Sequence, residues 1–319
     1  MRIAQVAPLA EAVPPLRYGG TERVVSYLTE ELVALGHEVT LFASGDSRTV
    51  ARLIPVVPRA LRLDPNARDT IAPHVQLVQS VLRRAAGFDV IHFHIDHYHL
   101  PAFNAARLPY LTTMHGRLDL PELPGLFRAF PEAPVVAISA SQRAALSAAN
   151  FIGTIHHGLP QDLLRPGAGE DGYLAFLGRI CPEKGLDRAI RIARRAGLPL
   201  RIAAKVERVD EAYFLKEIRP LLDGPGVEFV GEIGQDRMGG FLGSAAALLF
   251  PIDWPEPFGL VMVEAMACGT PVIGFARGSV PEVLEDGVSG FVVRDEAEAV
   301  AAVARLPALD RRAVRRAFE

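Results

Sequence analysis

RIAQVAP at residues 2–8 and EVTLFAS at residues 38–44 are two apolar, strand-forming runs, and the segment that they enclose decides the fold. Between them, apolar residues recur at helical spacing from Val24 to Leu35. Gly36 follows directly, where a glycine commonly ends a helix. A strand, a helix and a strand in this order predict a βαβ unit, in which the two strands are parallel.

The alternation of strand-like and helix-like segments continues along the whole chain. Such alternation predicts parallel sheets whose faces are covered by helices. Further strands are expected at residues 88–94, 109–115, 133–139, 173–179, 200–206, 227–233, 247–251, 271–275 and 290–293, and helices at residues 70–86, 100–107, 139–150, 186–197, 210–222, 235–245 and from 260 onward.

Residues 158–172 read GLPQDLLRPGAGEDG, which is rich in glycine, proline and acidic residues and is typical of a linker. A second series of strands and helices begins after this stretch. The sequence therefore predicts an α/β protein of two Rossmann-like, doubly wound parallel-sheet domains, residues 1–163 and 164–319, facing a central cleft. Sheets of this kind bind ligands at the carboxyl ends of their strands.

Composition limits the function classes. The chain has 319 residues and a formal net charge of −3, which argues against a nucleic-acid partner. No apolar run approaches the roughly 18 to 20 residues that cross a bilayer, and the N-terminus lacks a signal-peptide pattern. Cys181 and Cys268 are the only cysteines, a count that suits a reducing compartment. We therefore expect a cytoplasmic protein.

A basic cluster near the C-terminus leaves two interpretations open. It is either a solvated helix face or a surface for peripheral contact with anionic lipid. Its members are Arg311, Arg312, Arg315 and Arg316.

The stretch EPFGLVMVE at residues 256–264 places Glu256 and Glu264 eight positions apart around the start of an expected helix. Gly259 permits an unusual turn, and free backbone N–H groups at the helix start favour an anion such as phosphate. Carboxylates tolerate such an anion when each accepts hydrogen bonds from hydroxyl groups of the same ligand. Nucleotide sugars have this arrangement. The alternative is an acidic helix start with a second glutamate on a solvated face.

Two cations follow the first strand of the second domain. Arg179 ends that strand and Lys184 lies five residues later, where both could neutralise a diphosphate without a metal ion. In the first domain, Gly19 and Gly20 precede a helix, where adjacent glycines allow close approach to a phosphate. Surface side chains and a plain turn are the respective alternatives.

Histidines gather after two strands of the first domain. His115 ends one expected strand, where it could contact a sugar hydroxyl or relay a proton. The run HFHIDHYH at residues 92–99 supplies further histidines, but in a strand and loop they do not converge on one ion, so no metal site is expected. Asp96 and His97 are candidates for the acceptor side of the site.

Taken together, the chain resembles the family 4 retaining glycosyltransferases, which have the two-domain GT-B architecture. The resemblance rests on five ordered stretches: residues 19–47, AISASQR at 137–143, IHHGLP at 155–160, FLGRICPEKGLDRAI at 176–190 and residues 256–293. It implies transfer of a sugar, with retention of configuration, from a UDP-, GDP- or ADP-linked donor to a sugar, lipid or small-molecule acceptor. Retention through a nucleophile and retention by front-face attack both remain open.

The resemblance also implies roles for single residues. His115, Glu256, Arg179 and Lys184 would act at the reacting centre, residues 1–163 would take the acceptor and residues 164–319 the donor. The donor contacts would come from Gly19, Gly20, Arg179, Lys184, Gly231, Glu232, Ile233, Glu256, Pro257, Phe258, Gly259, Leu260, Val261 and Glu264.

One departure from the family pattern lies at the C-terminus. The chain ends at LDRRAVRRAFE, residues 309–319, where family members continue into a helix that crosses back to the first domain. The resemblance therefore implies that this crossover helix is incomplete. Two alternative functions remain beside transfer: a nucleotide-sugar epimerase on the same fold, and a nucleotide-sugar-binding module without turnover.

Overall fold

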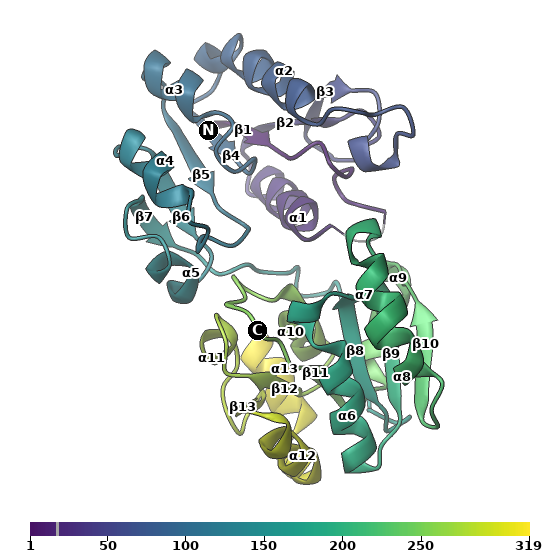
Figure 1. The fold of residues 1–319 in the computed structure, drawn as a ribbon. Coiled ribbons are helices and arrows are strands. Elements are labelled where there is room, and N and C mark those ends of the chain that lie inside the picture. The colour runs from purple at the N-terminus through teal and green to yellow at the C-terminus, as the bar shows by residue number, and fades with distance from the viewer. Residues whose placement is uncertain (17–18) are drawn as a thin grey trace. The chain divides into compact units, whose positions relative to one another are not determined.

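The structure is a computed structural model that describes residues 1–16 and 19–319. The chain divides into two compact units, Met1–Gly158 and Leu159–Glu319, and Figure 1 shows a helix-covered sheet in each. The sheets have seven and six strands, and every strand pair in them is parallel. The predicted fold class of two parallel-sheet α/β domains is confirmed.

The sheet of the first unit runs in the order β3-β2-β1-β4-β5-β6-β7. The strand order reverses between β1 and β4, so the loops that follow these two strands lie side by side at the carboxyl edge. The strands are β1 (Arg2–Val6), β2 (Glu38–Ser44), β3 (Arg52–Val57), β4 (Val90–Phe93), β5 (Tyr110–Thr113), β6 (Pro134–Ala137) and β7 (Asn150–Thr154), and the helices are α1 (Gly20–Ala34), α2 (Ile71–Leu82), α3 (Leu100–Ala106), α4 (Leu123–Ala129) and α5 (Ala140–Ala144).

The predicted helix at residues 139–150 is wrong over its second half. Ser139 caps the helix by accepting a hydrogen bond from the Gln142 backbone N–H at 2.9 Å, but α5 ends at Ala144. Asn150 instead pairs with Pro134 at the start of an edge strand. Strand pairing has overridden the helix propensity of this alanine-rich segment. The structure also adds β3 and α4, which the sequence patterns did not predict.

The sheet of the second unit runs in the order β10-β9-β8-β11-β12-β13, and its order reverses between β8 and β11. One apolar layer packs α6 and α12 on one face, and a second packs α9, α10 and α13 on the other. The strands are β8 (Leu174–Arg179), β9 (Leu200–Lys205), β10 (Val227–Gly231), β11 (Ala247–Phe250), β12 (Val272–Phe275) and β13 (Gly290–Val293), and the helices are α6 (Leu186–Ala196), α7 (Glu211–Tyr213), α8 (Arg219–Leu222), α9 (Gln235–Gly243), α10 (Leu260–Ala267), α11 (Val280–Val283), α12 (Glu296–Arg305) and α13 (Arg311–Phe318).

The basic cluster on α13 is not uniformly solvated. The Arg311 guanidinium donates hydrogen bonds to the carbonyl oxygens of Gly167, Gly243 and Ala245, each at 2.9 Å. Arg315 donates in the same way to three further carbonyls, those of Gln161, Leu164 and Ala267. Two of the four arginines, Arg311 and Arg315, therefore hold α13 against the rest of its unit. The other two, Arg312 and Arg316, are exposed.

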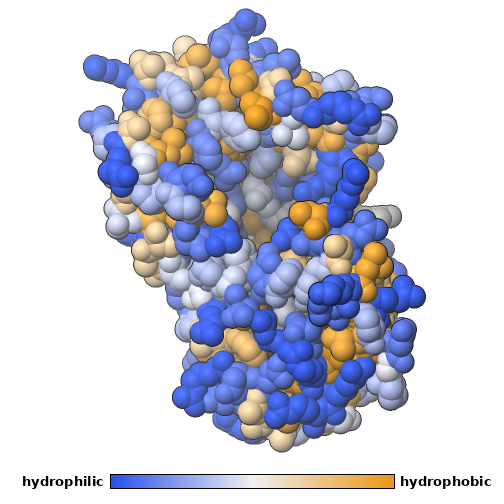
Figure 2. Space-filling view, viewed as in Figure 1, coloured by the Kyte–Doolittle hydropathy of each residue, from blue (hydrophilic) through white to orange (hydrophobic). Residues whose placement is uncertain are grey.

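Figure 2 shows hydrophilic side chains over most of the visible face of each unit, with hydrophobic side chains in scattered groups. Within the described residues, no helix is both long enough and apolar enough to cross a membrane.

Candidate functional site

The loops that follow β8 and β11 form the centre of the second unit's candidate site. Gly185 has a left-handed φ of 69°, and a Cβ built there would lie 2.2 Å from the Pro251 carbonyl oxygen. The Asp253 backbone N–H also donates to the Glu183 carbonyl at 2.8 Å. A glycine at 185 therefore allows the two loops to pack backbone against backbone at the point where the strand order reverses.

The fixed loops bring Lys184 and Glu256 into contact. The Lys184 ammonium forms an ion pair with Glu256 Oε2, although the residues are 72 positions apart in sequence. Trp254 Nε1–H donates to the same carboxylate oxygen at 3.0 Å, and its ring centroid lies 4.9 Å from Lys184 Nζ. The two charged side chains are 19% and 9% exposed, so each is partly withdrawn from water and depends on the other.

Arg179 lies in a second, more exposed ion-pair group. Its guanidinium is 3.0 Å from a carboxylate oxygen of Glu183 and 3.4 Å from one of Asp210. Both cations that the sequence assigned to a diphosphate are thus already paired with carboxylates of the same unit.

The helix α10 begins at Leu260, as predicted. Gly259 precedes it with a left-handed φ of 80°, and a Cβ there would lie 2.7 Å from Met262 Cε. Glu256 before the helix and Glu264 within it are both buried. Neither glutamate therefore lies on a solvated helix face.

Residues after β12 hold this loop in place, and sequence reasoning missed them. A Cβ on Gly278 would lie 2.3 Å from the Glu256 backbone nitrogen. Ser279 donates its backbone N–H to the Glu256 carbonyl at 3.0 Å and its hydroxyl to the Phe258 carbonyl at 2.8 Å. In the sequence, Gly278 and Ser279 shortly after the buried strand β12 were the feature that could have indicated this support.

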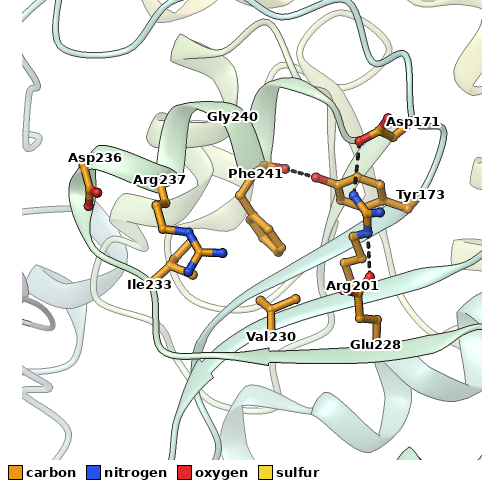
Figure 3. Close-up of a pocket in the computed structure, with 10 residues that line it drawn as sticks. All are labelled: Asp171, Tyr173, Arg201, Glu228, Val230, Ile233, Asp236, Arg237, Gly240 and Phe241. Atoms are coloured by element: carbon orange, nitrogen blue, oxygen red, sulfur yellow. Dashed lines mark hydrogen bonds and ion pairs between the residues drawn. The ribbon is translucent and has the colours of Figure 1, made fainter.

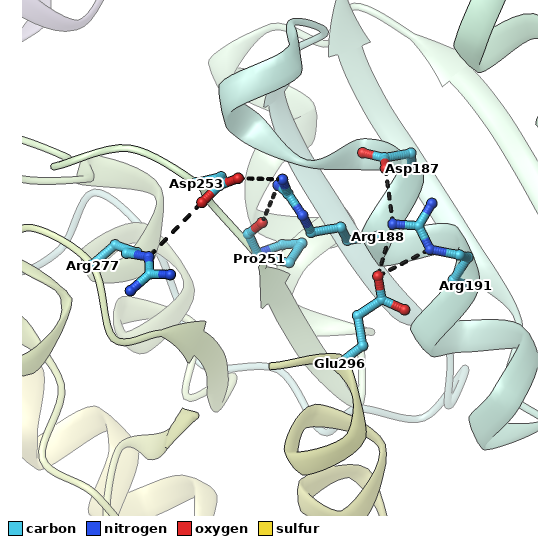
Figure 4. Close-up of polar contacts among 7 residues, drawn as sticks. All are labelled: Asp187, Arg188, Arg191, Pro251, Asp253, Arg277 and Glu296. Atoms are coloured by element: carbon cyan, nitrogen blue, oxygen red, sulfur yellow. Dashed lines mark hydrogen bonds and ion pairs between the residues drawn. The ribbon is translucent and has the colours of Figure 1, made fainter. Parts of the chain in front are cut away.

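Asp253 anchors the same loop from its other end, as Figure 4 shows. Its carboxylate lies 2.6 Å from an Arg188 guanidinium nitrogen and 3.9 Å from one of Arg277. Arg188 also donates to the Pro251 carbonyl at 3.2 Å. The loop that carries Glu256 is therefore fixed by charged contacts as well as by backbone contacts.

Three of the donor contacts that the resemblance implies, Gly231, Glu232 and Ile233, lie at the end of β10 or directly after it. Gly231 ends that strand with a φ of 76°, Glu232 is partly buried, and Ile233 is buried. Ile233 lines a pocket of about 410 Å³, into which Figure 3 shows Phe241 and Arg237 projecting from α9. The structure thus brings one of these three residues into a pocket wall.

In the first unit, the expected glycine pair lies at the start of α1. The helix begins at Gly20, and a Cβ on Gly19 would lie 2.8 Å from the Pro15 Cβ. Glu22 lies buried in the first helical turn, and its burial raises the pKa of its carboxyl group. This buried acid was not singled out from the sequence, because nothing in GGTER shows which side chains turn inward.

His115 is not an isolated histidine. It lies two residues beyond the end of β5, and both its ring nitrogens face other imidazoles: Nε2 is 2.8 Å from His94 Nδ1 and Nδ1 is 3.3 Å from His157 Nε2. His92 packs against His94, with ring centroids 4.0 Å apart. Two histidines of HFHIDHYH, His92 and His94, therefore meet His115, joined by His157, which sequence reasoning missed.

Asp96 and His97 lie in the exposed loop between β4 and α3. Asp96 has a left-handed φ of 52°, which is uncommon for a residue other than glycine. His99, from the same run, turns into the core, where its ring stacks on Phe93 and burial lowers its pKa to about 3. Among the described side chains, no group of three is arranged to hold a metal ion.

Comparison with known proteins gives the same assignment for both units. Residues 18–152 match the family model "Glycosyltransferase Family 4", and residues 165–317 match "Glycosyl transferases group 1". D-inositol 3-phosphate glycosyltransferase of Frankia alni is 30% identical over 86% of this chain and 82% of its own length. The homologous enzyme of Streptomyces griseus is 31% identical, but the match spans only 30% of its length.

Solved structures agree with this assignment. AviGT4, a glycosyltransferase involved in avilamycin A biosynthesis, superposes with a TM-score of 0.76 over 100% of this chain and 92% of its own, at 27% identity. HepE from Anabaena in complex with UDP gives 0.75 over 100% and 94%, at 18% identity, which shows the shared fold. From its two family matches, its relatives and its fold, the chain belongs to the family 4 glycosyltransferases of the GT-B fold.

Proposed function

We propose that the protein transfers a sugar from a nucleoside diphosphate sugar to a hydroxyl acceptor, with retention of anomeric configuration. The observation that carries the proposal is the Lys184–Glu256 ion pair beside Arg179, at the point where the second sheet reverses its strand order. Cations and buried carboxylates stand next to one another there, and the helix α10 begins three residues after Pro257. A ligand with both phosphate and hydroxyl groups matches that mixture.

In this proposal, donor binding exchanges ion-pair partners. The diphosphate takes the place of Glu256 opposite Lys184 and of the carboxylates opposite Arg179. Glu256 then accepts hydrogen bonds from sugar hydroxyls, and the ribose hydroxyls bind Glu264. Glu256, the most buried of the displaced carboxylates, thus keeps hydrogen-bond partners after the exchange, which limits the cost of donor binding.

The same cations assist the reaction. Negative charge grows on the diphosphate as the bond to the sugar breaks, and in this proposal Arg179 and Lys184 stabilise that charge. These two side chains supply the charge that a metal ion supplies in many other phosphate-transferring enzymes. Glu256, close to the sugar, would stabilise the positive charge that develops on the ring.

For the acceptor, we infer a polyol of the inositol class. Curated relatives in Frankia alni and Streptomyces griseus are named D-inositol 3-phosphate glycosyltransferases, and one in Mycolicibacterium smegmatis is named phosphatidyl-myo-inositol mannosyltransferase. In the proposal this acceptor binds to residues of the first unit, with Asp96 and His97 as candidate contacts.

A two-step experiment tests the proposal. The first step is a thermal-shift screen with UDP, GDP, ADP and TDP, because a ligand that binds only the folded state raises the melting temperature. The second step incubates sugars linked to the stabilising nucleotide with myo-inositol and inositol phosphate, and NMR reads the anomer of the product. Glu256→Gln should reduce transfer about 100-fold or more, whereas the exposed Glu217→Gln should leave it unchanged.

Three outcomes contradict the proposal. An epimer formed from the donor alone points to an epimerase. Nucleotide binding without transfer to any acceptor in the panel points to a binding module. Transfer by Glu256→Gln at the wild-type rate removes the role assigned to this carboxylate.

A further inference from the structure

Four side chains cross the carboxyl edge of the first sheet in a single hydrogen-bonded row. Gln5 lies in β1, His94 directly follows β4, His115 follows β5, and His157 follows β7. His94 Nε2 lies 2.7 Å from Gln5 Oε1, His94 Nδ1 lies 2.8 Å from His115 Nε2, and His115 Nδ1 lies 3.3 Å from His157 Nε2. We call this row the histidine chain.

Gln5, the first residue of the row, determines which ring nitrogen of each histidine carries the proton. The Gln5 carbonyl oxygen can only accept, so His94 carries its proton on Nε2 and offers the lone pair of Nδ1. His115 must then donate from Nε2, which leaves a lone pair on its own Nδ1 to accept from His157. Gln5 is fully buried, and its amide nitrogen has no hydrogen-bond partner among the described residues. With the Gln5 amide in this orientation, one tautomer follows for the whole row.

The row stays neutral because it is buried. Burial lowers the pKa of His94 and His115 well below 6.5, and lowers that of His157 to about 4. The titratable groups that face the row are also histidines: His92, which packs on His94, and His156, next to His157. Among the described residues, the charged groups that act on the pKa values of the row are thus other imidazoles.

We propose that Gln5 and His94 are positioning residues that hold His115 as the Nε2–H tautomer. In this tautomer, Nδ1 of His115 has a lone pair and accepts a hydrogen bond from a hydroxyl group of the donor sugar. This inference rests on the proposed function, together with the contact between His115 and a sugar hydroxyl that the family resemblance implies. The sugar hydroxyl would replace His157, whose contact is the longer of the two that His115 makes. His115 would then act neither as a cation nor as a proton donor.

The tautomer can be measured without any activity. In protein labelled with ¹⁵N-histidine, NMR distinguishes a protonated from an unprotonated ring nitrogen. We expect His94 and His115 to be neutral and protonated on Nε2 at pH values both above and below 6.5. Protonation on Nδ1, or a doubly protonated ring near neutral pH, overturns the inference.

Substitution of Gln5 extends the test to kinetics. Gln5→Leu removes the acceptor that fixes the direction, so we expect mixed tautomers and kcat about tenfold lower, with KM little changed. Gln5→Glu places a carboxylate against His94, which stabilises an imidazolium and moves the acid limb of the kcat/KM profile to higher pH. His37→Gln, near the N-terminus and outside the row, serves as the control and should change neither the profile nor the spectra of the row.

The two proposals fail in different ways. If the wild-type protein shows the expected tautomers but transfers no sugar, the proposed function is contradicted. The tautomers inferred for the histidine chain are then still supported. A wild-type protein that transfers sugar, with Gln5→Leu retaining the wild-type tautomers and kcat, contradicts the chain alone.

Discussion

The two sheets reverse their strand order in the same way, but they bury different polar groups at that point. In the first unit the carboxyl edge carries a row of imidazoles whose pKa values are lowered by burial. In the second unit the equivalent edge carries lysine, arginine and glutamate in ion pairs. One edge avoids the cost of buried charge by staying neutral, and the other by pairing charges.

This difference indicates whether acid or a single substitution destabilises each edge more. Removal of one neutral imidazole leaves no buried charge without a partner, so the row tolerates it. Acid, in contrast, protonates all of these imidazoles. Ion pairs tolerate mild acid, because carboxylates stay ionised, but the loss of one member leaves the other buried and unpaired. Acid should therefore damage the first unit, and single substitutions the second.

The largest effect should come from acid. Each histidine with a lowered folded pKa contributes stability that is complete above pH 6.5 and is lost as the pH falls towards its folded value, about 4 for His92 and His157. The unfolded chain binds more protons throughout that window, so the free energy of unfolding falls by about 1.4 kcal/mol per pH unit for each histidine. Several histidines lie together, so the first unit should unfold before the second.

Two probes separate the units in that titration. Trp254, the only tryptophan, reports on the second unit by its fluorescence. Hydrogen exchange read on peptides of β4 and β5 reports on the first. We expect protection of β4 and β5 to be lost while the Trp254 emission is still unchanged. Loss of both signals at one pH would show that the comparison between the edges does not govern stability.

Breaking the ion pair should give the next largest effect. Lys184→Ala leaves the Glu256 carboxylate with its lysine partner removed, and should lower the free energy of unfolding by about 3 kcal/mol. The double variant Lys184→Met with Glu256→Gln removes both charges and should recover most of that loss. Urea unfolding followed by circular dichroism measures these two variants and the single variant Glu256→Gln. Additive losses in the double variant would mean that the two side chains are not coupled.

Two glycines of left-handed φ allow a matched test of loop support. Gly278→Ala and Gly287→Ala place a side chain at φ values of 56° and 77°, so both incur backbone strain of about 1 kcal/mol. A Cβ at 278 also meets the Glu256 backbone at 2.3 Å, whereas no described atom lies within 4 Å of a Cβ at 287. Gly278→Ala should therefore have the lower melting temperature and weaker nucleotide binding. Equal effects would remove the support role of Gly278.

The smallest effect should come from the exposed pair. Arg179 and Glu183 are each about one third exposed, with 32% and 34% of their side-chain surface accessible, so water already screens them. Glu183→Gln should lower the free energy of unfolding by about 0.5 kcal/mol or less. Because it removes one of the carboxylates paired with Arg179, it should also strengthen the binding of a nucleoside diphosphate. If Glu183→Gln lowered the free energy of unfolding as much as Lys184→Ala, the Arg179–Glu183 pair would behave as a buried ion pair.

The sequence predicted much of the second sheet, because its strands are short apolar runs between turn residues. All six strands, β8 to β13, lie within or at the expected ranges. The first unit was predicted less well at its edges, where β3 and β7 are partly exposed. Edge strands carry little of the apolar pattern on which such predictions depend.

The site was predictable only as a set of residue types. Gly259 indicated where α10 begins, because a turn of positive φ favours glycine. The pairing of Lys184 with Glu256 was not predictable, since each was assigned to a different part of a ligand. Neither was Gln5, whose role depends on an amide orientation that only tertiary contacts fix.

The hydrogen bonds of Arg315 have a consequence for the chain ends of the second unit. Its guanidinium binds the carbonyls of Gln161 and Leu164 at 2.6 and 3.0 Å, so the last helix is fastened to the segment with which this unit begins. The first segment of this unit and helix α13 are thus neighbours. A circular permutant that joins α13 to this segment with a short linker and opens the unit at an exposed loop is expected to keep the order of the strands.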